Sequence, residues 1–444
     1  MATELETGQH PDAPTRIRKP SGRGPRIRKP SIRTPDGRKP SPRLLFLLGP
    51  AFVAAIAYVD PGNVAANLTA GARFGYLLVW VLVAANAIAM LIQYQSAKLG
   101  LATGKSLPEL LGQRLGAKGR RAFWVQAELV AAATDIAEVI GGAIALNLLF
   151  GLPLFIGGII VGVVSMLVLS MQSRRRQRTF ESVIMGLLAV ITIGFVAGLF
   201  VSPVNWGAAS GGLLPRFDGS GSVLLAASML GATVMPHAIY LHSSLARDRH
   251  GVPAGGVAGQ KAVTRLIRAT RWDVAIALLV AGAVNVAMLL LAAASLHGVA
   301  GTETIEGAHA AISSSLGPAI GAIFAVGLLA SGLASTSVGS YAGAVIMSGL
   351  LKVRVPLLLR RVVTLVPALV ILGTGIEPTG ALVLSQVLLS LGIPFAVIPL
   401  IRLTGDRRVM GVHVDAWWTR ALAWLAATLV VMLNIALIVL TVTT

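Results

Sequence analysis

The chain has 444 residues, of which 55% are hydrophobic and only 12% are charged. Soluble domains carry roughly 25% charged residues, so this composition excludes an ordinary soluble protein. The chain has no cysteine, which excludes a disulfide framework, a thiolate metal site and a redox dithiol. Its net charge of +19 is more typical of cytoplasmic loops than of a nucleic-acid partner, so we expect the lipid bilayer and no nucleic acid.

Residues 1–43 differ in composition from everything that follows. They are rich in Arg, Pro and Ser, and the sequence Arg-Ile-Arg-Lys-Pro-Ser occurs at 16–21 and again at 26–31. Because large apolar residues are almost lacking, we expect a disordered basic tail. The tail has no apolar core of a secretory signal peptide, so we expect it to stay in the cytoplasm.

Residues 44–444 form the predicted transmembrane domain. Apolar runs of about 20 residues are long enough to cross a bilayer as helices. We therefore expect an all-α membrane protein with eleven spans. Their predicted limits are 44–67, 76–97, 123–149, 152–171, 183–201, 223–245, 273–296, 318–347, 357–375, 379–401 and 417–440.

Lys and Arg are distributed unevenly between the gaps. Of the 37 Lys and Arg residues, all but Arg73 and Arg216 lie in the tail or close to the loops that follow spans 2, 4, 6, 8 and 10. Since cytoplasmic loops carry the excess of Lys and Arg, this pattern places the N-terminus in the cytoplasm and the C-terminus outside.

The first span contains Asp60-Pro61-Gly62-Asn63. A carboxylate deep in an apolar span is costly and indicates a functional site. Pro61 removes a backbone donor and Gly62 adds flexibility, so we expect the helix to break at these two residues. Backbone left unpaired at membrane depth is tolerated only where protein or a water-filled cavity covers it. The stretch therefore predicts two half-helices that meet at a polar site.

Span six contains a second interruption, Gly231-Ala232-Thr233-Val234-Met235-Pro236-His237. Each break lies in the first span of a block of five. Interrupted spans at matching positions indicate a binding site between inverted repeats of a transporter. We expect repeats over about 44–201 and 223–401, with 417–440 as an extra helix.

The two breaks offer a mixed set of metal ligands. Asp60 supplies a carboxylate and Asn63 an amide oxygen, while the freed carbonyls of Ala57 and Ala232 add two more oxygens. Met235 adds a thioether, which favours transition metals over Mg²⁺ and Ca²⁺. We interpret the set as a weak, selective site for Mn²⁺, Fe²⁺ or similar ions.

Span three carries Glu128, Asp135 and Glu138 within an arc of roughly 80° at 100° per residue. Chains of Asp, Glu and His in membranes commonly serve as proton relays. His237 and His242 could extend the path, because histidine changes charge near neutral pH.

Four other residues belong to the predicted site or its surroundings. Arg360 and Arg361 are either counter-charges for the acidic face or ordinary anchors at the cytoplasmic end. Asn285 and Gln386 are lone amides that either join helices or line the cavity. No phosphate loop, nucleophile elbow or hydrolytic triad stands out, so we expect neither an enzyme nor an ATP-driven pump.

The motifs Asp60-Pro-Gly-Asn63, Thr134-Asp135-Ile-Ala-Glu138 and Met235-Pro-His237 resemble those of the NRAMP family of proton-coupled divalent-metal symporters. The resemblance extends from about residue 44 to the C-terminus. It implies a LeuT-like 5+5 inverted repeat, with helices 1 and 6 broken and one helix added. It also implies a bacterial plasma-membrane importer of Mn²⁺ that accepts Fe²⁺, Co²⁺ and Cd²⁺. Separately, we expect no resident cofactor and a chain that functions as a monomer.

The resemblance also implies roles for individual residues. The metal ligands would be Asp60, Asn63, Met235 and the carbonyls of Ala57 or Ala232, with Gln386 approaching in some states. The proton route would run through Asp60, His237 and the acidic face of span three to the arginine pair.

Three alternatives stay open at this point. The first is an amino-acid symporter on the same scaffold, which would hold a substrate carboxylate at half-helix N-termini. The second is a Mg²⁺ transporter of the same family, which Met235 disfavours. The third is a receptor or channel that does not accumulate its ligand.

Overall fold

The computed structural model describes residues 49–171, 177–251, 256–302, 304–353, 355–375 and 378–443. The predicted basic tail, 1–43, lies outside these residues. In the described ranges the chain forms α-helices and short 3₁₀ segments and has no strands. The predicted all-helical fold is therefore confirmed.

Each of the eleven predicted spans overlaps helical structure. Eight helical segments of the described chain are long and apolar enough to cross a membrane, or up to nine if the bent pair of α15 and α16 counts as one. The number of eleven crossings stays a prediction. The unbroken long helices are α3 (Val79–Thr103), α5 (Ala117–Phe150), α6 (Leu154–Ser170), α7 (Gln177–Val201), α11 (Gly256–Ser295), α13 (Pro318–Leu351), α14 (Leu357–Thr374), α15 (Pro378–Thr404) and α17 (Trp417–Thr443).

Two helices are interrupted, as the sequence predicts. The first consists of α1 (Pro50–Ala55), the 3₁₀ segment η2 (Ile56–Val59) and α2 (Pro61–Phe74). Its break falls at Asp60, one residue before the predicted Pro61-Gly62, because Asp60 is extended at φ −71° and ψ 166°. Proline fits the first helical position, where its missing N–H is not needed, so Pro61 begins a helix instead of ending one.

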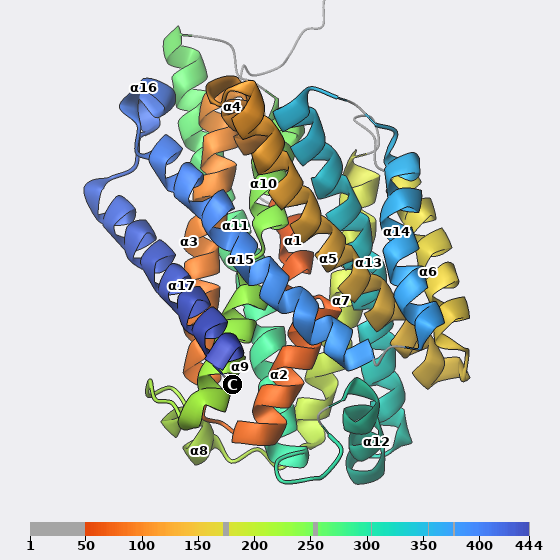
Figure 1. Ribbon diagram of the computed structural model, residues 1–444. Helices are drawn as coiled ribbons and strands as arrows, with labels where there is room; N and C mark the ends of the chain where they lie inside the picture. Colours follow the sequence, from red (N-terminus) through yellow and green to blue (C-terminus); the bar gives the residue numbers. More distant parts are fainter. Residues whose placement is uncertain are drawn as a thin grey trace, which may run out of the picture. The chain divides into compact units, whose positions relative to one another are not determined.

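The second interrupted helix consists of α9 (Gly219–Thr233) and α10 (Pro236–His250). Val234 and Met235 separate the two halves, and Pro236 is the first residue of α10. Figure 1 shows α1 and α10 in the upper half of the bundle, with α2 and α9 in the lower half. The two broken helices therefore run in opposite directions, as inverted repeats require.

Several helical segments were not predicted from hydropathy. α11 begins at Gly256, well before the predicted limit of 273, because its first turns are polar and basic. Four short helices cover the ends of the bundle: α4 (Leu107–Arg114), α8 (Trp206–Gly211), α12 (Ile305–Leu316) and α16 (Arg407–Met410). Apolar runs mark only what lies in the bilayer, so such ends carry no hydropathy signal.

Small residues bring some helices very close together. Gly194 of α7 faces Gly327 of α13, and a Cβ built on Gly194 would lie 2.7 Å from the Gly327 Cα. In membranes, where apolar burial drives little association, such close contact stabilises helix pairs.

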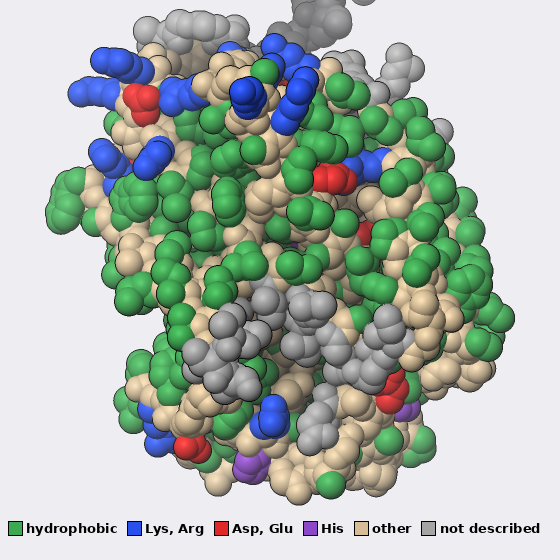
Figure 2. Space-filling model, viewed as in Figure 1, with side chains coloured by type: hydrophobic (Ala, Val, Ile, Leu, Met, Phe, Trp, Pro, Cys, Tyr) green, Lys and Arg blue, Asp and Glu red, His purple; other side chains and the backbone are tan. Residues whose placement is uncertain are grey.

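The outer surface fits a bilayer environment. Large apolar side chains such as Phe200 and Ile193 are exposed. Figure 2 shows apolar side chains over the middle of the visible face, whereas Lys and Arg gather mainly at its upper end. A surface of this kind is typical of lipid contact along the middle and of basic loops at one end.

Candidate metal centre

Asp60 lies at the start of α2 and is completely buried. Its Oδ1 accepts hydrogen bonds from the Asn63 backbone N at 2.8 Å and from Asn63 Nδ2 at 2.7 Å. Its Oδ2 has no hydrogen-bond partner among the described residues. One carboxylate oxygen therefore holds the helix end, and the other stays unused in an interior where such groups are costly.

Asn63 connects the two breaks. Its Nδ2 donates to Asp60 Oδ1 and also to the carbonyl of Ala232, at 2.9 Å. Oxygens from α2 and α9 thus converge on one point, which the amide nitrogen now occupies. Thr233, which was not predicted as a site residue, places its Oγ1 3.5 Å from Asn63 Oδ1. Its position beside the second break was the available signal.

The structure places Met235 and Gln386 close to these breaks in different ways. Met235 is fully buried and is the residue that precedes α10. Gln386 of α15 lies directly against Gly62, where an added Cβ would overlap its amide nitrogen. Its Oε1 has no hydrogen-bond partner within the described chain. Ala57 is buried in η2, and its part in binding stays a prediction.

Asn285 of α11 uses both ends of its amide to hold the first break. Its Nδ2 donates to the carbonyl of Tyr58 at 2.7 Å, and its Oδ1 accepts from Asn67 Nδ2 at 3.0 Å. Tyr58 precedes the break and Asn67 follows it. The geometry fits the expected interhelical amide, while the cavity-lining role stays untested.

The acidic face of α5 meets the arginine pair of α14. Arg361 Nη1 lies 2.6 Å from Asp135 Oδ1 and also contacts Oδ2, and the guanidinium is fully buried. Arg360 Nη2 lies 2.6 Å from Glu128 Oε1. Both predicted counter-charges are therefore paired with the acidic face. Two residues that were not predicted complete this network: Thr336 Oγ1 lies 2.5 Å from Asp135 Oδ1, and Ser165 Oγ lies 2.9 Å from Arg361 Nε.

Glu138 of α5 and His237 of α10 are both buried. Neither oxygen of Glu138 and neither ring nitrogen of His237 has a hydrogen-bond partner in the described ranges. His242 is different, because its Nδ1 lies 2.8 Å from Gln93 Oε1, and Gln93 Nε2 donates to Tyr58 Oη at 2.6 Å. His242 is thereby connected to the turn before Asp60 through Gln93, a residue that sequence analysis missed.

The candidate metal ligands include few charged side chains. No cluster of three or more His, Cys, Asp or Glu side chains suited to a metal occurs among the described residues. Asp60 would therefore be the one charged ligand, supported by amide, carbonyl and thioether groups. Such a set suits a cation that must bind selectively and then leave.

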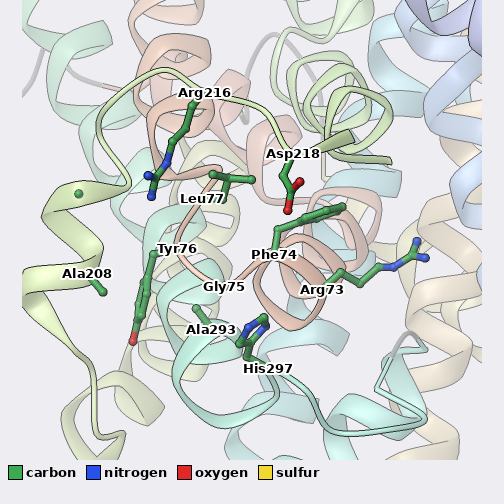
Figure 3. A pocket seen from close by; sticks show the side chains of 11 residues that line it. Arg73, Phe74, Gly75, Tyr76, Leu77, Ala208, Arg216, Asp218, Ala293 and His297 are labelled. Carbon is green, nitrogen blue, oxygen red and sulfur yellow. The ribbon is translucent and has the colours of Figure 1, made fainter. Parts of the chain in front are cut away.

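A separate pocket of about 440 Å³ lies beside the C-terminal end of α2 (Figure 3). Arg73 and Arg216, the two basic residues that stand apart in the sequence, both line it, together with Asp218 and His297. Two guanidiniums oppose one carboxylate among these lining groups. A positive balance of this kind disfavours a divalent cation, so this pocket does not compete with the breaks as a metal centre.

Comparisons with known proteins agree with the geometry. The profile of the natural resistance-associated macrophage protein-like (Nramp) family matches residues 51–440. A divalent metal cation transporter, MntH, from Mycobacterium tuberculosis is 62% identical over 398 residues, which cover 90% of this chain and 92% of the relative.

Solved structures extend the likeness to the fold. A manganese transporter from Eremococcus coleocola superposes with a TM-score of 0.80 at 30% identity, over 92% of this chain and 89% of that one. MhsT in complex with L-phenylalanine superposes with a TM-score of 0.60 at 15% identity, over 89% of this chain and 98% of that one. The second likeness concerns the fold alone.

Proposed function

This chain belongs to the Nramp family, and we propose that it imports divalent transition-metal ions, with Mn²⁺ the first candidate, together with protons. Fe²⁺, Co²⁺ and Cd²⁺ are further candidate substrates. The membrane protein holds its substrate between the two broken helices and exposes the site to each side in turn.

One observation carries this proposal: Asn63 Nδ2 donates at once to Asp60 Oδ1 and to the Ala232 carbonyl. These two oxygens come from different inverted repeats and face the same point. A cation at that point would take over both contacts and would also attract the unused Asp60 Oδ2. Rotation of the Asn63 amide would then turn its oxygen, in place of its nitrogen, toward the ion.

Met235 supports the choice of metal. Oxygen ligands alone would favour Mg²⁺ or Ca²⁺, whereas a thioether adds affinity for softer transition metals. Met235 directly precedes α10, and Ala232 lies in the last turn of α9 on the other side of the same interruption. We assign it the selectivity of the site.

For the proton we propose a route from Asp60 through His237 and Glu138 toward the pair of Asp135 and Arg361. His237 and Glu138 are buried groups with unused proton-binding atoms in the described chain, and Asp135 is already held by Arg361. A metal ion at Asp60 favours the ionised carboxylate and so displaces its proton. Glu128 and Arg360 extend the same face.

The basic end of the bundle supports a cytoplasmic N-terminus and an extracytoplasmic C-terminus in a bacterial plasma membrane. Metal would enter from the side of α8 and α12 and leave on the side of α4 and α16. The proposal requires one copy of the chain, because every candidate ligand comes from the same chain.

An amino-acid symporter is the alternative function on this scaffold, and MhsT, which was solved in complex with L-phenylalanine, has a similar fold. A buried carboxylate at the first break disfavours it, because Asp60 would repel the carboxylate of an amino acid. Mn²⁺ uptake into proteoliposomes with an inward proton gradient separates the two functions. We expect Mn²⁺ to accumulate and to acidify the lumen, and amino acids to have no effect. Amino-acid uptake without Mn²⁺ uptake would overturn the proposal.

A further inference from the structure

A second pocket, of about 510 Å³, lies on the flank of the bundle between α3, α11 and the start of α17. None of the residues assigned to metal or protons lines it. Its wall is mostly apolar and includes Met90, Leu91, Val274 and Ala275. The pocket is also lined by two polar neutral side chains, Tyr94 and Thr419, and by three charged ones, Lys98, Arg271 and Asp415.

The charges in this pocket do not balance. Lys98 Nζ lies 2.6 Å from Asp415 Oδ1, and Gln95 Nε2 donates to Asp415 Oδ2 at 2.9 Å, so this carboxylate is fully engaged. Arg271 is exposed and forms no ion pair with any described carboxylate. Two cations against one anion leave a single positive charge beside an apolar wall.

Exposed tryptophans near this pocket indicate that it lies at the membrane interface. Trp418 lines the pocket, and Trp272 follows Arg271 directly in the chain. Trp272, Trp417 and Trp418 are 57%, 81% and 53% exposed. Tryptophans concentrate where lipid headgroups meet acyl chains. The pocket lies at the ends of its helices, because Lys98 is near the C-terminal end of α3 and Trp418 is at the start of α17.

We propose that this pocket binds one anionic phospholipid. Its phosphate lies beside Arg271 and supplies the missing negative charge, while an acyl chain follows the wall formed by Met90, Leu91 and Val274. Basic pockets between transmembrane helices on the cytoplasmic side bind anionic headgroups in this way. The lipid would contact α17, the helix outside the inverted repeats, and both α3 and α11.

Native mass spectrometry of the delipidated full-length protein tests this binding directly. The protein is offered equal amounts of phosphatidylglycerol and phosphatidylcholine, and the retained lipid is counted. We expect the wild type to retain phosphatidylglycerol preferentially. We expect Arg271→Gln to retain about fivefold less phosphatidylglycerol than the wild type. Arg271→Lys should keep most of it. Arg268→Gln is the matched control, because Arg268 is an exposed arginine of the same helix that does not line the pocket.

Four results would overturn the proposal. They are equal retention of both lipids by the wild type, unchanged binding in Arg271→Gln, an equal loss in Arg268→Gln, and displacement of the lipid by free glycerol phosphate. The first and last use only the wild-type protein, so they decide even if a variant fails to fold. No readout depends on metal transport.

Discussion

Asn63 donates two hydrogen bonds to the same oxygen of Asp60, one from its backbone at 2.8 Å and one from its side chain at 2.7 Å. The two bonds have separate purposes. The backbone bond caps α2 and persists whatever side chain is present at 63. The side-chain bond extends to Ala232 and is the one that an incoming cation would replace.

Asn63→Ala should therefore leave the fold intact and weaken transport. The variant keeps the cap on α2 but lacks the amide that we propose as a ligand, so we expect the KM for Mn²⁺ to rise by about tenfold or more. Uptake into proteoliposomes at a series of Mn²⁺ concentrations gives this value. Asn67→Ala, one turn further along the same helix, is the control, because Asn67 bonds Asn285 and not Asp60. Equal effects of the two substitutions would contradict a ligand role for Asn63.

Asp135→Asn should destabilise the protein. Arg361 is fully buried, and Asp135 is its one acidic partner among the described residues. An unpaired buried charge costs about 3–5 kcal/mol, so the thermal unfolding transition in detergent should fall markedly. Glu128→Gln provides the comparison, because the Glu128 side chain is 24% exposed and water can solvate Arg360 there. A smaller loss for Asp135→Asn than for Glu128→Gln would show that the buried pair is not the main contribution.

Glu138→Gln should separate metal movement from proton movement. Glutamine has nearly the same shape as glutamate, and neither oxygen of Glu138 has a hydrogen-bond partner in the described chain. The fold should therefore persist, while the proton flux that accompanies Mn²⁺ uptake falls. A pH-sensitive dye inside the proteoliposomes reports that flux. Unchanged Mn²⁺-stimulated proton flux in the double variant Asp135→Asn, Glu138→Gln would exclude the proposed route.

The breaks and the charged groups were predictable from the sequence because their signals are local. Proline, glycine and a buried carboxylate mark a broken helix wherever it folds, and the arc of Glu128, Asp135 and Glu138 follows from helical geometry. The predicted position of the first break, at Pro61 and Gly62, was wrong by one residue, since the break falls at Asp60 and Pro61 begins α2.

Other parts of the site could not be predicted, since they depend on which helices meet. Thr336, Ser165 and Gln93 are ordinary polar residues of their own helices, and only tertiary packing brings them to Asp135, Arg361 and His242. The early start of α11 was also missed, because hydropathy does not report helix that extends beyond the bilayer.

Gly194→Ala should destabilise the contact between α7 and α13. The added Cβ would lie 2.7 Å from the Gly327 Cα, and backbone cannot move aside as a flexible side chain can. Overpacking of this kind costs about 1–3 kcal/mol. Gly186→Ala on the same helix is the control, because nothing lies within 4 Å of the added carbon. Thermal unfolding of both variants measures the difference, and equal transition temperatures would contradict the close contact.

The most direct test of the central claim is Mn²⁺ uptake by Met235→Ala in excess Mg²⁺ and Ca²⁺. The wild type should take up Mn²⁺ despite the competing ions, whereas the variant should be inhibited by them, because it lacks the thioether. Met229→Ala is the control, because Met229 is an equally buried methionine that lies within α9 and not in the interruption between α9 and α10. If Met235→Ala resisted Mg²⁺ and Ca²⁺ as well as the wild type does, the assignment of selectivity to the second break would be wrong.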